Sequence, residues 1–419
     1  MSLLQTFQLT NYTPYAPSGL TARGSAMKAM KKTIIILAFA LASFTGCVSK
    51  DMYGHQEGGE EISFSTPVVG AMTKSSNPSE VPHYGEIDTT YPTDEFFTVF
   101  AVQHASPSNY DGWSTANATY YINGVAFAYD TRYNGWSGSS TLKPEADRKA
   151  YPWPMGSVLS FGCYSPTNAH SATPGNGTGT FVYAADGLSV TDFSVHSDAS
   201  LQQDLMYAER IYNKNSNNNT PGGYNGLDLT FKHMLSSIRF TVKQEREYAR
   251  MTMALKSIKL GKVQYKGSFK ENINQEVDAT ASYSSAPKWT SVSPDLTTTA
   301  YQAFSGTAEL TTASQPVGNA LLLMPQLIND YDAQNNLITN LDAYITVEYS
   351  VTVTVPGADA DADSHSYEQS ATVRLSDLTD KWEMGNRYIY NISIGYDTIT
   401  FSPTVSKWEN VSIESAVTQ

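Results

Sequence analysis

Acidic and imidazole side chains are the residues of this chain whose types and spacing could bind a metal ion. Asp359, Asp361 and Asp363 alternate in the pattern D-x-D-x-D, which is how a calcium-binding loop begins. Such a loop needs a glycine next and a bidentate glutamate at its end, where this chain has Ser364 and Ser370. The seven histidines include no pair at the close spacing of a zinc site. We therefore expect a solvated hairpin loop at these aspartates, no bound metal and no cofactor.

Catalytic patterns are also missing from the sequence. No G-x-S-x-G nucleophile elbow occurs, and the glycine-rich run 175–179 has neither the preceding strand nor the following helix of a phosphate loop. Cys163 lies in an apolar stretch without a nearby histidine, so we expect a buried, inert thiol. His233 lies on an alternating apolar pattern, which favours a buried, hydrogen-bonded imidazole. A hydrolytic carboxylate pair stays open as an alternative, because its members would lie far apart in sequence. We predict no catalytic residue and no enzymatic activity.

The sequence around Cys47 indicates a specific chemistry for this residue, namely lipid attachment. A basic segment precedes a short apolar run at 33–42, and Cys47 follows shortly after. The run is too short to span a bilayer and is typical of a signal peptide. The stretch resembles the bacterial lipobox, which implies that residues 27–46 are removed and that Cys47 carries the lipid; an ordinary signal peptide is the alternative. Residues 1–26 precede a complete signal, so we interpret them as a misassigned start.

Composition restricts the class of protein. Removing 46 of the 419 residues leaves 373, which suits two domains better than one core. A hydrophobic content of 41% and an aromatic content of 12% argue against disorder. The formal net charge of −13 excludes the basic footprint that nucleic acid requires and disfavours adhesion to anionic lipid. Membrane attachment would then depend on the lipid of Cys47, and Cys163 would have no disulfide partner.

Alternating apolar and polar residues predict an all-β protein. In the clearest run, 341–355, apolar residues occupy one face and polar residues the other, as in an antiparallel sheet with one face on a core. A Pro356-Gly357 turn ends this run, and 367–375 is predicted to return as its hairpin partner. Further strands are predicted at 96–103, 120–129, 158–164, 227–231, 237–243, 257–265, 319–324 and 387–394.

The longest polar break divides these predicted strands into two β-sandwich domains. Residues 213–225, NKNSNNNTPGGYN, cannot pack a core and are the predicted linker. We expect an N-terminal sandwich at 62–212 and a C-terminal sandwich at 226–419. Residues 47–61 are polar and glycine-rich, as expected for a tether between the lipid and the first domain.

Several short segments also recur in an order that is typical of a known family. They are YPWP at 151–154, VLSF at 158–161, YSP at 164–166, DLMYA at 204–208, LTFKHMLSSI at 229–238, YKGSF at 265–269, LLMPQ at 322–326, WEMGN at 382–386, YIYNISI at 388–394 and VSKW at 405–408. Together they resemble the fimbrillin family, the FimA- and Mfa1-like type V pilins of Bacteroidales. The resemblance covers most of the mature chain and implies two transthyretin-like β-sandwich domains.

The resemblance also implies a route of assembly. In such pilins a lipoprotein precursor reaches the outer membrane, a trypsin-like protease removes the N-terminal strand, and a strand of a neighbouring subunit fills the groove. In this chain Ile62 and Phe64 belong to the candidate displaced strand. Lys74 is the candidate cleavage site, although the family's better-known processing is at arginine and an uncleaved surface lysine is the alternative. Val411 and Ile413 alternate in the candidate donor strand.

The expected function is that of a structural subunit, stalk or tip, of cell-surface fimbriae. Its expected partners are other fimbrial subunits, the processing protease, the membrane through Cys47 and, for a tip subunit, a surface ligand. The alternative is a glycan-binding outer-membrane lipoprotein or tip adhesin, in which Tyr120, Tyr121, Trp113 or Trp136 would stack on sugar rings. Most of these aromatic residues are explained more simply as strand residues.

Overall fold

The computed structural model describes residues 61–69, 86–87, 91–104, 119–130, 135–138, 151–167, 179–184, 187–215, 226–271, 288–291, 300–331, 337–339, 342–355, 363–396 and 398–408. Within them the fold is all-β, with two short 3-10 helices, η3 (Ala199–Leu201) and η4 (Leu375–Asp377). The β-sandwich fold predicted from the alternating pattern is confirmed.

The N-terminal part of the fold contains a nine-stranded sheet and a four-stranded sheet. The larger sheet follows the order β1 (Ser63–Phe64), β5 (Gly135–Gly138), β4 (Thr119–Asp130), β3 (Phe97–His104), β6 (Val158–Ser165), β9 (Met206–Ala208), β11 (Thr230–His233) and β2 (Val68–Val69), with β10 (Ile211–Lys214) on β6. The smaller sheet follows the order β15 (Lys288–Ser291), β14 (Lys266–Lys270), β8 (Gly187–Ser194) and β7 (Thr180–Ala184).

Both faces of β3 are buried because two cores meet it. Phe97, Val99 and Ala101 alternate into one apolar cluster, whereas Phe100 and Val102 point into the other. The second cluster continues to Tyr183 and Leu188 in the smaller sheet. Successive side chains of a strand point to opposite faces, so such double burial is expected of a central strand between two layers.

Two further four-stranded sheets form the C-terminal sandwich. One has the order β17 (Gln315–Leu323), β12 (Ser236–Gln244), β24 (Asn386–Ile394) and β25 (Ile399–Lys407). The other has the order β16 (Tyr301–Glu309), β13 (Met251–Gly261), β21 (Tyr344–Val355) and β22 (Asp363–Arg374). Two small pairs accompany them, β18 (Gln326–Leu327) with β23 (Lys381–Trp382) and β19 (Asn329–Tyr331) with β20 (Leu337–Thr339).

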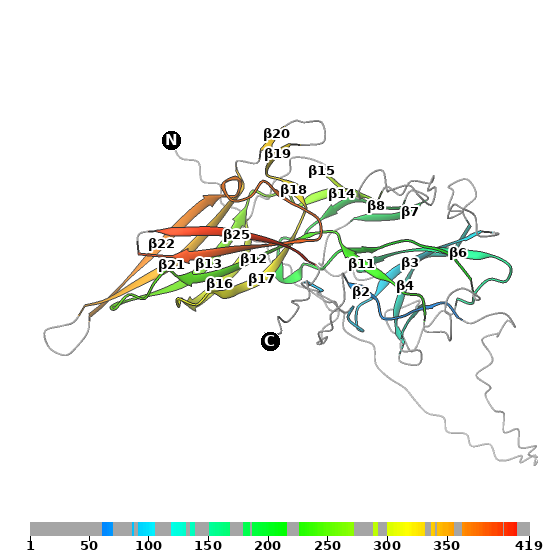
Figure 1. Ribbon diagram of the computed structural model, residues 1–419, viewed down its shortest axis with the longest axis horizontal. Coiled ribbons are helices and arrows are strands. Elements are labelled where there is room, and N and C mark those ends of the chain that lie inside the picture. Colours follow the sequence, from blue (N-terminus) through cyan, green and yellow to red (C-terminus); the bar gives the residue numbers. More distant parts are fainter. Residues whose placement is uncertain are drawn as a thin grey trace, which may run out of the picture. The chain divides into compact units, whose positions relative to one another are not determined.

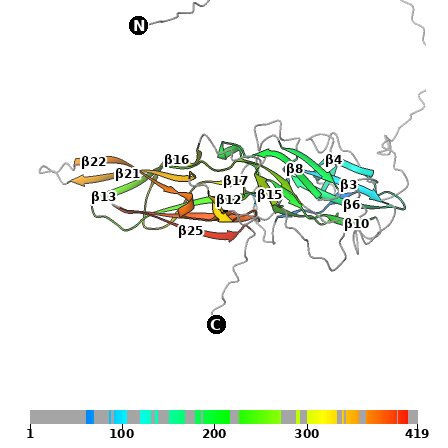
Figure 2. The same ribbon diagram turned by 90° about the horizontal axis from the view of Figure 1, so that it is seen from above.

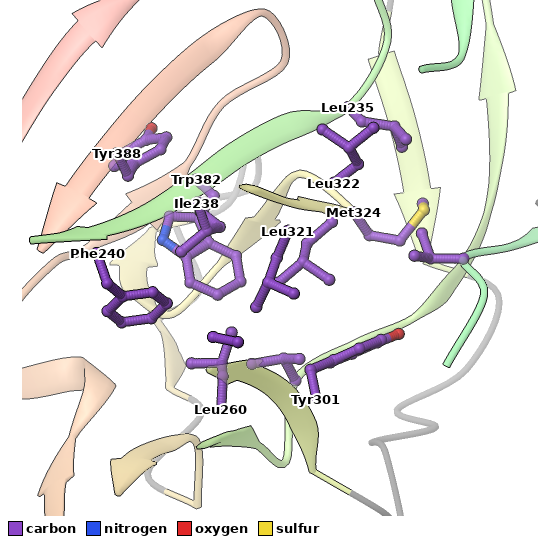
Figure 3. Packing of buried hydrophobic residues seen from close by; sticks show 14 of the residues in the cluster. Leu235, Ile238, Phe240, Leu260, Tyr301, Leu321, Leu322, Met324, Trp382 and Tyr388 are labelled. Carbon is purple, nitrogen blue, oxygen red and sulfur yellow. The ribbon is translucent and has the colours of Figure 1, made fainter. Parts of the chain in front are cut away.

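The two C-terminal sheets lie face to face, with β13, β16 and β21 on one side and β12 and β25 on the other (Figures 1 and 2). Figure 3 shows large side chains from both sheets converging between them, including Ile238 and Phe240 of β12, Leu260 of β13 and Tyr301 of β16. The predicted hairpin is confirmed, because β21 pairs with β22 in an antiparallel register from Tyr344–Arg374 to Val355–Asp363.

Strands that follow the 213–225 break also pair with strands that precede it. β11 is antiparallel to β9, and β14 is antiparallel to β8. Residues 216–225 lie outside the described part, so the linker stays a prediction, as do the domain limits drawn from it.

Candidate functional site

One short stretch near the start of the described chain closes the nine-stranded sheet, and we call residues 61–69 the closing segment. Its β1 half is antiparallel to β5, with Ser63 opposite Ser137 and Phe64 opposite Trp136. Its β2 half is parallel to β11, with Val69 opposite Phe231. The two ends of the sheet therefore belong to one continuous segment, which lies between β5 and the stretch that enters β11. Figure 1 shows β2 beside β11.

Backbone hydrogen bonds fasten the closing segment on both sides. Towards β11, Ser65 N donates to Leu227 O at 3.0 Å, Leu227 N donates to Ser63 O at 2.9 Å, and Val68 N donates to Leu229 O at 2.9 Å. Ile62 N donates to Tyr151 O at 2.7 Å on the other side. These are main-chain contacts, so another extended segment could make the same set regardless of its sequence.

The apolar side chains of the closing segment are part of the core. Ile62, Phe64 and Val69 are each 0% exposed. The Phe64 ring meets three other rings edge to face, with centroid distances of 5.5 Å to Phe97, 5.4 Å to Phe127 and 5.8 Å to Phe161 and interplanar angles of 82–88°. Edge-to-face packing of this kind adds about 0.5–1.5 kcal/mol per pair beyond area burial. The candidate displaced residues Ile62 and Phe64 are thus deeply packed, not surface residues.

Two residues opposite the closing segment fit it closely. Gly226 has a φ of +85°, and a Cβ at this position would lie 2.5 Å from Ser65 N. Only glycine therefore allows the backbone at 226 to approach the closing segment this closely. The Ser65 hydroxyl donates to Asp228 Oδ1 at 2.9 Å. Gly226 and Asp228 closely precede β11. The sequence alone did not indicate a role for either residue.

A second contact site follows the closing segment at residues 86–87, which we call the staple. The buried Glu86 carboxylate pairs with Arg239 and accepts a hydrogen bond from the Ser237 hydroxyl, and Arg387 Nε lies 3.5 Å from it. Burial and then the neighbouring Arg387 lower the pKa of Arg239 to about 10. Ile87 is 4% exposed and packs in the same core as Phe64. Glu86 therefore contacts the C-terminal sheet at β12 and β24, and the adjacent Ile87 packs in the N-terminal core.

The staple also reaches the predicted buried histidine. Ile87 N donates to Asp204 Oδ2 at 3.0 Å, and His233 Nδ1 lies 3.1 Å from Asp204 Oδ1. His233 stacks on Trp408, the last described residue, with ring centroids 3.9 Å apart. The prediction of a buried, hydrogen-bonded His233 is confirmed.

Several other predicted residues can be located. Cys163 is a buried free cysteine, as predicted, and burial raises the pKa of its thiol well above the ordinary value, which disfavours the nucleophilic thiolate. Trp136 is 0% exposed and cannot be a sugar platform. The Tyr120 and Tyr121 hydroxyls donate to the carbonyl oxygens of Tyr183 and Pro152. These bonds tie both rings to the framework.

The remaining predicted site residues lie outside the described residues, and so does the whole lipobox. They are Cys47, Lys74, Trp113, Asp359, Asp361, Val411 and Ile413. Within the described part, no cluster of three or more His, Cys, Asp or Glu side chains could hold a metal ion. The described part also has no helix that is both long and apolar enough to cross a membrane.

Comparisons with known proteins give a consistent picture. A family model described as fimbrillin-like matches residues 88–408. A crystal structure of a fimbrial protein from Bacteroides vulgatus ATCC 8482 is 16% identical and aligns over 83% of this chain and 99% of its own, with a TM-score of 0.50. At this identity the likeness shows the fold alone. No curated protein matches the sequence.

Two further solved structures resemble the chain more distantly. A candidate cell adhesion protein from Bacteroides uniformis ATCC 8492 is 13% identical, covering 83% of this chain and 99% of its own, with a TM-score of 0.39. The tip fimbrial protein Mfa3 from Porphyromonas gingivalis, with a C-terminal truncation, is 9% identical. That alignment covers 75% of this chain and 95% of the other, with a TM-score of 0.27.

Proposed function

Because this chain belongs to the fimbrillin-like family, we propose that it is a subunit of cell-surface fimbriae whose closing segment is replaced at assembly by a strand of a neighbouring subunit. A fimbrial role at the cell surface, structural or adhesive, follows from the family itself. The finer steps are the proposal: lipid anchoring through Cys47, cleavage at Lys74 and strand exchange.

The observation that carries the proposal is the double pairing of the closing segment. It supplies the last strand on both sides of one seam and three fully buried apolar side chains, Ile62, Phe64 and Val69. Its departure would open an apolar groove between two unpaired strand edges. Such edges are aggregation sites unless another strand covers them, so replacement and removal must be coupled.

The contacts of the staple support a boundary between the closing segment, which would be removed, and the chain after Lys74, which would remain. Lys74 follows Val69 closely in sequence and precedes Glu86. Cleavage at Lys74 would free the closing segment, whereas Glu86 and Ile87 would hold the new N-terminal stretch on the body through Arg239, Arg387 and Asp204. The shortened chain would therefore keep its two sandwiches while it offers an open groove.

Export and location complete the proposal. The lipid on Cys47 would hold the precursor at the outer membrane until a trypsin-like protease cuts after Lys74. Other fimbrial subunits are then the partners of the opened groove, and a tip subunit would also contact a surface ligand. The glycan-binding alternative gains no support from Trp136, which is buried, or from Tyr120 and Tyr121, whose hydroxyls bond within the fold.

The test is to follow the chain from precursor to product. The full-length lipoprotein is treated with a trypsin-like protease and analysed by N-terminal sequencing and by gel filtration, beside a Lys74→Gln control. We expect a new N-terminus at Ser75, loss of the closing segment and, with other fimbrial subunits added, growth of oligomers in the wild type only. Cleavage at Lys74 followed by a stable monomer, even with other subunits added, would refute exchange.

A further inference from the structure

We infer that the groove under the closing segment selects a donor strand that has an aromatic side chain at the position of Phe64 and no acidic side chain at that of Ser65. A strand from a different subunit then fits it better than the chain's own residues 409–419. This inference rests on the proposed function and goes beyond it, because it names the partner's chemistry.

The first requirement comes from the site around Phe64. Three phenyl rings, those of Phe97, Phe127 and Phe161, stand edge-on to the Phe64 ring at 5.4–5.8 Å and leave it 0% exposed. A tightly packed interior has no spare space, so a smaller side chain leaves a void that its neighbours fill only in part. An aliphatic residue at this position also loses all three edge-to-face contacts.

The second requirement comes from Asp228. The Ser65 hydroxyl donates to its carboxylate at 2.9 Å, and Ser65 N is bonded to Leu227 O in the same stretch. A hydroxyl or another donor satisfies the carboxylate at this point. A carboxylate on the incoming strand would instead face a like charge directly across the pairing, which is destabilising.

The chain's own tail has the right alternation and the wrong side chains. Residues 410–414 read N-V-S-I-E, and residues 61–65 read E-I-S-F-S. Aligned in this way, the tail places Ile413 at the position of Phe64 and Glu414 at that of Ser65. Run in the opposite direction, it places Val411 at the position of Phe64, which fills the site even less. No aromatic residue occurs in 409–419, so neither direction meets the first requirement.

The partner is therefore an extended strand of another subunit with the pattern aliphatic, any residue, aromatic, then a hydroxyl-bearing or neutral residue. Such a preference would favour mixed assembly over a polymer of this chain alone. The closing segment itself meets both requirements, so it keeps the groove shut until it is cut away.

Competition between peptides tests the inference on the full chain. A protease recognition sequence is placed at residues 76–82, so that the cut does not depend on the natural enzyme. The cleaved protein is loaded with a fluorescent peptide of residues 60–70, which is displaced by unlabelled peptides. These are the native 60–70 peptide, its Phe64→Ile, Ser65→Glu and Thr66→Ala variants, the 408–419 peptide and its Ile413→Phe/Glu414→Ser variant. Thr66 is exposed, so Thr66→Ala is the matched control.

The expected order of affinity is specific. Phe64→Ile should weaken binding about 10-fold, and Ser65→Glu about 3-fold at low salt and less at high salt. Thr66→Ala should bind as the native peptide does. The 408–419 peptide should bind at least about 10-fold more weakly than the native one, and its double variant should recover most of the difference. An Asp228→Asn protein should bind the Ser65→Glu peptide as tightly as the native peptide.

Other outcomes have separate meanings. Equal affinity of the 408–419 and native peptides, or no gain from Ile413→Phe/Glu414→Ser, would overturn the selectivity while leaving strand exchange intact. If the native 60–70 peptide itself never enters the cleaved protein, the proposed function fails, and the selectivity fails with it.

Discussion

The imidazole of His233 lies flat against the indole of Trp408, with ring centroids 3.9 Å apart and an interplanar angle of 3°. His233 ends β11, the strand that pairs with the closing segment, and Trp408 directly follows β25 and precedes the candidate donor residues. One buried contact therefore joins β11, at the edge of the seam, to the residue that precedes the C-terminal tail. The Asp204 carboxylate lies within hydrogen-bond distance of His233 Nδ1 and also accepts a hydrogen bond from Ile87 N of the staple.

Replacing Trp408 should therefore weaken the fold on both sides of this contact. Trp408 is 0% exposed, and truncation of a large buried aromatic residue costs about 3–5 kcal/mol of unfolding free energy. We expect Trp408→Ala to lose that much in chemical denaturation and Trp408→Phe to lose clearly less, because a ring can still stack on His233. Equal losses in the two variants would contradict a role for stacking.

Removing the negative charge of the staple should destabilise the protein although no apolar contact is lost. The Glu86 side chain is 4% exposed and lies between two arginines on adjacent strands, Arg239 and Arg387. Without the carboxylate, two like charges face each other, and the loss of one member of a buried pair costs about 3–5 kcal/mol at full burial. Arg239 is partly exposed, so we expect about 1–3 kcal/mol for Glu86→Gln. Hydrogen exchange of residues 86–104 should speed up, and unchanged exchange there would refute the staple.

Gly226 provides a steric test of the seam. An alanine there suffers the strain of a positive φ and also a clash with the backbone of Ser65 and Phe64. Gly156 is the matched control, because its φ is +70° but an added Cβ meets nothing within 4 Å. Both substitutions should cost about 1 kcal/mol of strain, and only Gly226→Ala should expose residues 62–69 to hydrogen exchange and hasten their proteolytic loss. The same behaviour in both variants would contradict the close fit.

One buried carboxylate outside the seam should make stability depend on pH. Burial raises the pKa of Glu271, and its Oε2 accepts hydrogen bonds from Leu188 N at 2.7 Å and the Tyr183 hydroxyl at 3.1 Å. A raised folded pKa means that the folded state binds more protons than the unfolded state above pH 4.5, so this group's contribution to stability falls as pH rises from there through the folded pKa.

Glu271→Gln should remove that part of the pH dependence. The glutamine carbonyl can accept the same two hydrogen bonds without a buried charge. We expect the variant to melt at a higher temperature than the wild type at pH 7.5, with the difference shrinking towards pH 4.5. A constant difference across this range in differential scanning calorimetry would show that Glu271 does not titrate in this way.

The sequence predicts long strands with a continuous apolar pattern, whether one face is buried, as in β21, or both faces are, as in β3 and β6. The run 341–355 is readable because β21 alternates between buried and half-buried positions along most of its length. β22 is exposed along most of its length, so its prediction depended on the turn before it and on the neighbouring strand β21. β7, β8 and β14 were not predicted, because their short patterns become meaningful only in the sheet that they form together.

The residues of the candidate site also differ in how clearly the sequence indicates them. Ile62 and Phe64 are visible in the sequence as an alternating apolar pair, but the parallel bridge between Phe64 and Leu227 joins positions more than 160 residues apart, which no local pattern specifies. Gly226 looks like the end of a polar, glycine-containing run, and Glu86 is a single acid without a pattern around it. Their roles come from long-range packing, which periodicity does not encode.

A reversible lock on the closing segment tests the central proposal most directly. Ser63 and Ser137 are cross-strand partners on β1 and β5, and the Cα separation of such pairs, about 4.5–5.5 Å, suits a disulfide. The Ser63→Cys/Ser137→Cys lipoprotein, oxidised and then cleaved at Lys74, is compared with Ser63→Cys alone for incorporation of a labelled neighbouring subunit. We predict no incorporation while the disulfide is intact and incorporation at the control rate after reduction. Incorporation by the oxidised, cleaved protein at the control rate would contradict the replacement of residues 61–69.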